Sequence, residues 1–174
     1  MKNKQYYGDQ FEDLVYKSFL KIFPKEYIFK NIKFDYRNFY KEIKQTEIDI
    51  LIINGYDIYV IECKNINKPI KGKIISSYWE EFVDNEWVKI LNPFYQNRVH
   101  VNAVDYYLNK DCGLNANRYT IKSFVVFRNI NYIKDEMTKK MSWNIESLID
   151  RIFKNKKIQE KTLVLDLINE KEGI

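Results

Sequence analysis

The chain has 174 residues, with 29 Lys and Arg against 24 Asp and Glu, which gives a formal net charge of +5. Because 45% of the residues are hydrophobic and 16% are aromatic, the composition excludes a disordered chain and is typical of one domain with a packed core. The longest apolar stretch, 48–61, is interrupted by Asp49, Asn54 and Asp57, and the first residues lack an apolar signal run, so we expect a soluble cytoplasmic protein.

The cysteines and the charge restrict the functional classes without naming one. Cys63 and Cys112 cannot by themselves form a disulfide framework or a four-ligand zinc site. A basic chain attracts polyanions such as nucleic acids, because bound phosphates release counterions. The abundance of Lys, Ile, Asn and Tyr, however, is also what an AT-rich genome produces without selection for binding. The charge alone therefore does not establish a nucleic-acid partner.

The first part of the chain predicts a helix, a strand and a loop. Apolar residues recur at helical spacing over residues 5–23, and Pro24 ends that pattern. Residues 27–34 alternate imperfectly between apolar and polar, which predicts a strand. Residues 35–45 have no clear period, so we predict a loop there.

The strongest strand signal surrounds the pair Asn54-Gly55. The flanking runs, 46–53 and 56–63, are rich in Ile, Val and Tyr. An Asn-Gly pair between two such runs predicts a tight hairpin, because both residue types tolerate a positive φ. Both runs are nearly continuously apolar, which predicts central strands that are buried on both faces.

The rest of the chain predicts a second hairpin and then alternating helices and strands. The hairpin should turn at Asp84-Asn85, between strands at about 73–82 and 86–90. Asn92 and Pro93 are favoured at the N-cap and first position of a helix. The later elements are a helix, a strand, a helix, and a final helix or strand: 92–110, 119–127, 144–154 and 158–169. The sum is a single α/β domain with a mixed sheet.

Three charged residues on the central hairpin are candidates for chemistry. Asp49 lies within one apolar strand, and Glu62 and Lys64 lie near the end of its partner, on the same face of that strand. A carboxylate in an apolar strand is costly to bury unless it is paired or binds a metal. Paired carboxylates suit Mg²⁺ or Mn²⁺, whereas a structural salt bridge is the alternative. Glu47 competes with Asp49 for the same role.

Two predicted helices add further polar candidates. Glu12 lies at the edge of the apolar stripe of the first helix and can reach toward the sheet, although an ordinary boundary glutamate is the alternative. Gln96 and His100 share the inward face of the second long helix, near its N-terminus. His100 could be a metal ligand or a base, and a hydrogen-bonded core histidine is the alternative.

These residues, taken together, match a known family. The matching segments occur in the family's order: Gly8 to Glu12, Glu47-Ile48-Asp49, Ile61 to Asn65, and Asn92-Pro93 with Gln96. The chain resembles the PD-(D/E)xK nuclease superfamily and, more narrowly, the NERD (nuclease-related) domain, over roughly residues 6–128. The resemblance implies an α/β fold with a restriction-endonuclease-like core, in which helices flank a mixed central β-sheet. It also implies one NERD-like domain over residues 1–174, with a C-terminal helical extension at about 140–170.

The resemblance assigns roles to individual residues. Asp49, Glu62, the backbone carbonyl of Cys63 and Glu12 would hold Mg²⁺ or Mn²⁺, Lys64 would be the catalytic lysine, and Gln96 would orient the site. Closeness in sequence suggests phosphate contacts for three basic residues: Lys71, Lys73 and Arg98. Tyr78 and Trp79 could stack on bases, with packing in the hairpin core as the alternative.

The expected function is metal-dependent hydrolysis of phosphodiester bonds in nucleic acid, with DNA as the expected substrate and no membrane partner. Many nucleases of this fold act as dimers, so a homodimer stays open. Two alternatives remain: a non-catalytic module that binds nucleic acid or protein, and an antitoxin-like or scaffold protein whose polar cluster is structural.

Overall fold

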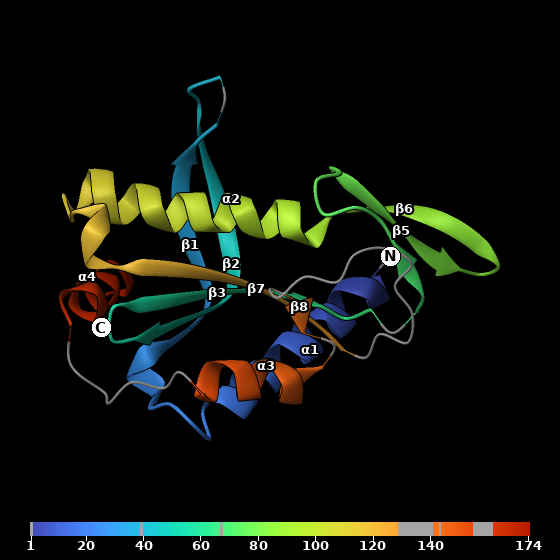
Figure 1. Cartoon of the computed structure of the whole chain (residues 1–174), viewed down its shortest axis with the longest axis horizontal. Coiled ribbons are helices and arrows are strands. Elements are labelled where there is room, and N and C mark those ends of the chain that lie inside the picture. Colours follow the sequence, from blue (N-terminus) through green and yellow to red (C-terminus); the bar gives the residue numbers. More distant parts are fainter. Residues whose placement is uncertain (1, 39, 67, 129–140, 143, 155–161) are drawn as a thin grey trace.

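The computed structural model describes residues 2–38, 40–66, 68–128, 141–142, 144–154 and 162–174. Its centre is a five-stranded mixed sheet in the order β1-β2-β3-β7-β8, and a separate three-stranded sheet has the order β4-β5-β6. The strands are β1 Ile28–Arg37, β2 Ile43–Asn54, β3 Asp57–Lys64, β4 Ile70–Lys71, β5 Tyr78–Val83, β6 Glu86–Leu91, β7 Thr120–Phe127 and β8 Met141–Ser142. The helices are α1 Lys2–Phe19, α2 Pro93–Tyr106, α3 Ile145–Phe153 and α4 Leu163–Glu172 (Figure 1).

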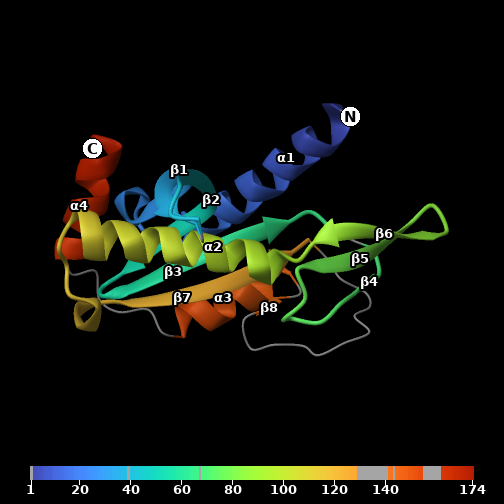
Figure 2. The same ribbon diagram turned by 90° about the horizontal axis from the view of Figure 1, so that it is seen from above.

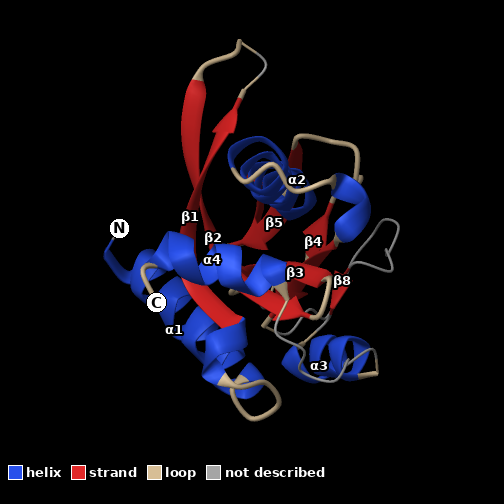
Figure 3. Ribbon diagram, turned by 90° about the vertical axis from the view of Figure 1, so that its left-hand side faces the viewer, coloured by secondary structure: helices blue, strands red, loops and turns tan. Residues whose placement is uncertain are grey.

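Helices cover both faces of the five-stranded sheet (Figures 1 and 3). β1, β2 and β3 are antiparallel, whereas β3–β7 and β7–β8 are parallel pairs. On one face, residues of α2 and α4 pack against Leu51 and Val60. On the other face, residues of α1 and α3 pack against Ile52 and Ile61. The predicted mixed α/β fold, with β2 and β3 as buried inner strands, is confirmed.

The predicted turns and caps are confirmed in position, with one shift. The central hairpin turns one residue later than expected, because Asn54 still pairs with Asp57 and only Gly55 of the predicted pair has a positive φ, 67°. Asn92 caps α2 by accepting a hydrogen bond from the Phe94 N–H, as the sequence predicts. The second hairpin turns at the predicted Asp84 and Asn85, at φ of 48° and 67°.

Two predicted boundaries are wrong in the first third of the chain. The helix ends at Phe19 rather than at residue 23, because the chain turns there: the N–H groups of Ile22 and Phe23 both donate to the Phe19 carbonyl. The predicted loop at 35–45 contains the ends of two strands, since β1 runs to Arg37 and β2 begins at Ile43. These ends form an arm that projects beyond the helices (Figures 1 and 3), so most of its side chains are exposed and show no period.

The C-terminal part of the described chain adds helices to the same core. α3 contributes Ile145, Leu148 and Ile152 to the α1 side of the sheet, and α4 contributes buried residues to the α2 side. The predicted last element is a helix where it is described, and residues 158–161 lie outside the described part. Among the described helices, none is long and apolar enough to cross a membrane.

A kink in the β1–β2 pair changes which face its side chains take. Asn31 and Asp49 lie between two paired positions and take no part in the ladder, and Asn31 has a φ of 56°. Ile50 faces α1 whereas Ile48, two residues earlier, faces α2. In a regular strand both would face the same side, so the backbone rotates at Asp49.

The kink predicts a specific pattern of stability at Asn31. Valine tolerates a positive φ poorly whereas glycine adopts it freely. We expect Asn31→Val to lower the free energy of unfolding by about 1–2 kcal/mol and Asn31→Gly to leave it nearly unchanged. Lys33→Val, at an exposed position of the same strand, is the control and should change stability little in urea denaturation. Equal tolerance of valine at both positions would contradict the strain at Asn31.

Candidate metal and nuclease site

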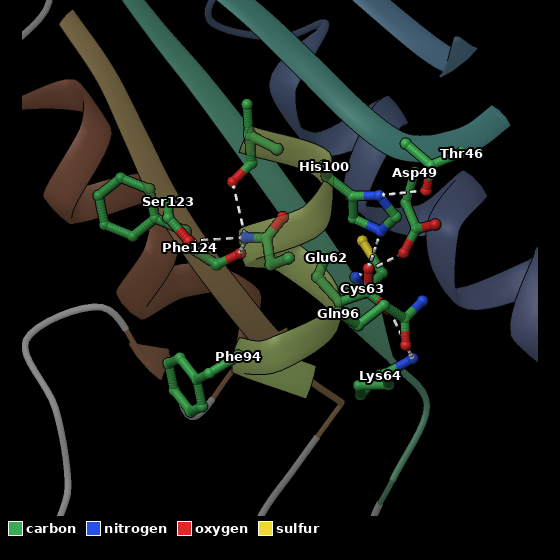
Figure 4. A network of polar contacts seen from close by, with 12 residues as sticks. Thr46, Asp49, Glu62, Cys63, Lys64, Phe94, Gln96, His100, Ser123 and Phe124 are labelled. Atoms are coloured by element: carbon green, nitrogen blue, oxygen red, sulfur yellow. Dashed lines mark hydrogen bonds and ion pairs between the residues drawn. The ribbon is translucent and has the colours of Figure 1, made fainter. Parts of the chain in front are cut away.

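The candidate site lies where two central strands separate. β2 and β3 pair from the Asn54–Asp57 turn only as far as Ile50 and Ile61. Beyond that point β2 continues along β1, and β3 continues along β7 as far as Lys64. The next residues at this fork are Asp49 and Glu62. The Cys63 N–H donates to Asp49 Oδ2 at 2.7 Å, so a side chain replaces the missing strand partner (Figure 4).

Glu62 is the buried centre of the polar network. Its residue is 1% exposed, yet Oε2 lies 2.8 Å from His100 Nε2 and Oε1 lies 2.5 Å from Lys64 Nζ (Figure 4). Burial raises the pKa of a carboxyl group, but here the hydrogen bond from His100 and the charge of Lys64 outweigh it and lower the pKa of Glu62. Glu62 is therefore a carboxylate at neutral pH.

The pKa of Asp49 is shifted in the opposite direction to that of Glu62. Burial of its carboxyl group, followed by the negative charge of Glu62, raises its pKa well above the usual value. The hydrogen bond from the Cys63 N–H acts in the other direction without cancelling this. The two carboxyl groups thus disfavour each other's ionised forms, and a cation between them would relieve that repulsion.

Lys64 and Gln96 connect the end of β3 to the first turn of α2. Lys64 Nζ donates to Gln96 Oε1 at 3.0 Å. Burial lowers the pKa of an amine, but the nearby charges of Glu62 and Asp49 outweigh it and raise the pKa of Lys64. The Lys64 ammonium is therefore held charged, between a carboxylate and an amide oxygen.

Glu12 comes from α1, which covers the face of the sheet opposite to α2. Glu12 is half-buried, and burial raises the pKa of its carboxyl group. The negative charges of Asp9 and Glu62 also raise this pKa, whereas the positive charge of Lys30 lowers it. Glu12 in turn contributes to the raised pKa of Asp49. The structure thus brings all five predicted residues to one end of the β2–β3 pair: Glu12, Asp49, Glu62, Lys64 and Gln96.

His100 and Thr46 complete the network. The sequence identifies His100 as a candidate but not Thr46. His100 is 3% exposed, and Thr46 Oγ1 lies 2.8 Å from its Nδ1 (Figure 4). With both ring nitrogens engaged, His100 is a hydrogen-bonded core histidine, and its partner is the predicted metal ligand Glu62. His100 lies four residues after Gln96, and this spacing predicts that both side chains share one face of the helix. Nothing in the sequence pointed to Thr46, because its neighbours come from the folded arrangement of β2 and α2.

Several other candidates lie apart from this network. Glu47 is exposed and pairs with Lys33 at 3.4 Å, so Asp49 is the residue at the fork. Arg98 is exposed, lies over the ring of Tyr95 at 4.9 Å, and is two residues from Gln96, or about 200° around the helix. It lines a separate pocket of about 230 Å³.

The remaining basic and aromatic candidates belong to the three-stranded sheet or its adjoining loop. Lys71 pairs with Glu80 at 3.2 Å, and Lys73 is exposed in the loop that precedes β5. Trp79 is 2% exposed and packs against Phe94, so it is a core residue and not a stacking surface. Tyr78, by contrast, is 51% exposed.

The residues at the fork have the chemistry that a hard divalent cation needs. The described residues include no group of three or more His, Cys, Asp or Glu side chains already arranged as a metal site. However, the buried Glu62 Oε1 has the Lys64 ammonium, at 2.5 Å, as its one partner among the described residues. Together with the disfavoured charge of Asp49, this buried oxygen fits a site in which a cation replaces the lysine as the partner of Glu62.

Sequence comparisons agree with this geometry. A mixed sheet between helices, with an acidic pair and a lysine at the fork of two strands, is consistent with a restriction-endonuclease-like core. The family model described as "Nuclease-related domain" (NERD) matches residues 7–128. The chain therefore belongs to the NERD family.

One similar protein and the structural comparison complete these findings. An uncharacterised protein of Bacillus anthracis is 29% identical over 101 residues, which are 57% of this chain and 45% of that protein. The chain thus aligns with less than half of the length of this relative. No solved structure matches the chain significantly.

The raised pKa of Asp49 predicts that this residue costs stability at neutral pH. Below the unfolded-state pKa of about 3.9, Asp49 is protonated in both states and costs no stability. Above its raised folded-state pKa, the folded protein carries the full cost of the ionised carboxylate. We therefore expect Asp49→Asn to raise the free energy of unfolding at pH 7 in EDTA, with the gain shrinking toward pH 4. Urea denaturation of both proteins across this range measures it. Asp57→Asn, which removes the partner of Lys122 at the other end of β3, should give no such gain.

The His100 contacts predict a graded loss of stability. His100→Phe leaves Glu62 Oε2 without its donor, so we expect the free energy of unfolding to fall by about 2–3 kcal/mol. Thr46→Val removes only the outer hydrogen bond and should cost about 1 kcal/mol. Both are measured by urea denaturation at pH 7. A His100→Phe variant as stable as the parent would show that this contact does not hold Glu62.

Proposed function

We propose that the protein is a metal-dependent nuclease that hydrolyses phosphodiester bonds in nucleic acid, with DNA as the first substrate to test. The observation that carries this proposal is the network at the strand fork. A buried carboxylate, a second carboxylate with a disfavoured charge, and a lysine lie together there. Membership of a nuclease-related family points in the same direction.

Asp49 and Glu62 would hold Mg²⁺ or Mn²⁺, with the Cys63 carbonyl and Glu12 as further oxygen donors. Bound there, the cation would supply Lewis-acid polarisation of the scissile phosphate and a lower pKa for a bound water. Cys63 positions Asp49 through its N–H, and His100 positions Glu62 through Nε2. Both carboxylates are thus oriented by hydrogen bonds before any ligand arrives.

Lys64 would act as a charged group and not as a base. Its ammonium is held between Glu62 and Gln96, and nearby negative charge favours the protonated form. In this role it would orient the attacking water or stabilise the negative charge that develops on the phosphate. Gln96 would keep the ammonium pointed toward the carboxylates, from a helix end that the Asn92 cap fixes in place.

Cleavage assays with matched variants test this function. Linear, circular and single-stranded DNA are incubated with and without Mg²⁺ or Mn²⁺. We expect Lys64→Ala and Glu62→Gln to lower the rate at least about a hundredfold, and Gln96→Ala to lower it by about 10–100-fold. Lys122→Ala is the control, because it also breaks a lysine–carboxylate pair, with Asp57, but at the other end of β3. Cleavage that needs no metal, or that survives Lys64→Ala, would contradict the proposal. Binding without cleavage would favour the non-catalytic module.

Thermal unfolding provides a test of the metal site that does not depend on cleavage. A cation that binds only the folded state should raise the melting temperature of the parent in millimolar Mg²⁺ or Mn²⁺. Asp49→Asn should remove most of this increase, and Asp57→Asn should retain it. If neither metal shifts the parent, the proposed ligands are wrong.

A further inference from the structure

The three-stranded sheet, β4-β5-β6, occupies the chain between Lys64 and Gln96. These two residues are hydrogen-bonded to each other at 3.0 Å, so the insertion begins and ends beside the candidate site. In Figures 1 and 2, β5 and β6 extend away from the five-stranded sheet, beyond the N-terminal end of α2. The near end of the small sheet, where the Asn92 N–H donates to the Ser77 carbonyl, therefore adjoins the proposed catalytic lysine.

One face of the small sheet is fixed to the protein body. Ile70 and Trp79 are buried there in a cluster with Val125 and Phe127 of β7. Gly72 lies against the Trp79 ring so closely that a Cβ atom would come within 2.1 Å of it. The side-chain amide of Asn92 donates to the carbonyls of the loop before β5, including Ser76, which anchors that loop to the start of α2. The small sheet is thus a firmly attached element.

The opposite face carries aromatic rings and lysines. The register pairs Tyr78 with Leu91, Glu80 with both Lys71 and Lys89, and Phe82 with Trp87. These side chains share one face, because they alternate with the buried Trp79 and Ile70. Tyr78 is 51% exposed and Trp87 is 38% exposed.

The lysines on this face lie directly over the rings. Lys89 Nζ is 4.0 Å from the centre of the Tyr78 ring, and Lys71 Nζ is 4.0 Å from that of Trp87. Phe82 adds a third ring, 5.1 Å from Trp87. Two of these three rings thus carry an ammonium over one face, and Lys71 also pairs with Glu80 at 3.2 Å. A bound strand would replace these contacts with base stacking and with contacts between the lysines and its phosphates.

We propose that this outer face of β4-β5-β6 binds an unpaired polynucleotide strand and guides it to the site between Lys64 and Gln96. Exposed rings stack on bases without regard to sequence, and neighbouring lysines neutralise the backbone. The proposal rests on the proposed function and adds to it the class of substrate: nucleic acid with a single-stranded segment. A duplex hides the faces of its bases in its own stack, so this surface favours unpaired strands.

Binding without catalysis tests this proposal. Fluorescence anisotropy in EDTA measures the affinity for a labelled oligo(dT), for oligo(U), and for a duplex of the same length. We expect Tyr78→Ala and Trp87→Ala each to weaken oligo(dT) binding on the order of tenfold. Trp87→Phe should keep most of the affinity, since a ring remains. Tyr40→Ala is the matched control, because Tyr40 is 79% exposed on the β1–β2 arm.

The outcomes separate this surface from the catalytic proposal. The proposed binding surface is supported if both alanine variants lose affinity for single strands while the Tyr40→Ala variant keeps it and all variants have the same melting temperature. This holds even if no cleavage is ever found. The comparison of oligo(dT) with oligo(U) distinguishes a DNA strand from an RNA strand. Three results would overturn the proposed binding surface: unchanged affinity in both variants, an equal loss of duplex binding, or a dimer of this chain formed through the face. None of them would affect the separate proposal of metal-dependent cleavage.

Discussion

The ionised carboxylate of Glu62, buried at the end of an apolar strand, is the constraint on which the rest of the site depends. An unpaired carboxylate in this position would cost several kcal/mol, so the fold must supply partners for it. The chain supplies Lys64 from the same strand and His100 from α2, at 2.5 Å and 2.8 Å. Each partner has a second contact of its own, with Gln96 or with Thr46. Glu62 is therefore held by two short chains of polar contacts that join β2, β3 and α2.

The position of α2 makes those contacts possible. Asn97 lies between Gln96 and His100 in sequence, and its side-chain amide donates to the carbonyls of Val60 on β3 and Phe124 on β7. This contact fixes the helix over two parallel strands, with Gln96 facing Lys64 and His100 facing Glu62 (Figure 4). From the other face, α1 brings Glu12 within electrostatic range. Helices on both faces of the sheet thus contribute residues to the fork. For this reason the residues of the site lie far apart in the sequence.

The sequence predicts the acidic pair and lysine because charged residues are conspicuous in apolar strands. Asp49, Glu62 and Lys64 stand out within runs of Ile, Val and Tyr, and the Asn92 cap sets the phase that places Gln96 and His100 inward. The sequence cannot predict the kink at Asn31 and Asp49, since it arises from the pairing of two strands. Nor does it reveal the role of Thr46, or which of Tyr78 and Trp79 faces the core. Those depend on register, where a shift of one residue reverses every side chain.

In the proposed metal site, Asp49 and Glu62 would hold a divalent cation, and the Lys64 ammonium takes the place of the cation beside Glu62 when no metal is bound. Anomalous diffraction from crystals grown with Mn²⁺ would locate this cation. We expect a manganese peak between the Asp49 and Glu62 carboxylates, with the Lys64 ammonium displaced from Glu62 Oε1 and still near Gln96. Manganese found elsewhere, or an intact Lys64–Glu62 ion pair with no manganese beside it, would show that Asp49 and Glu62 are not the metal ligands.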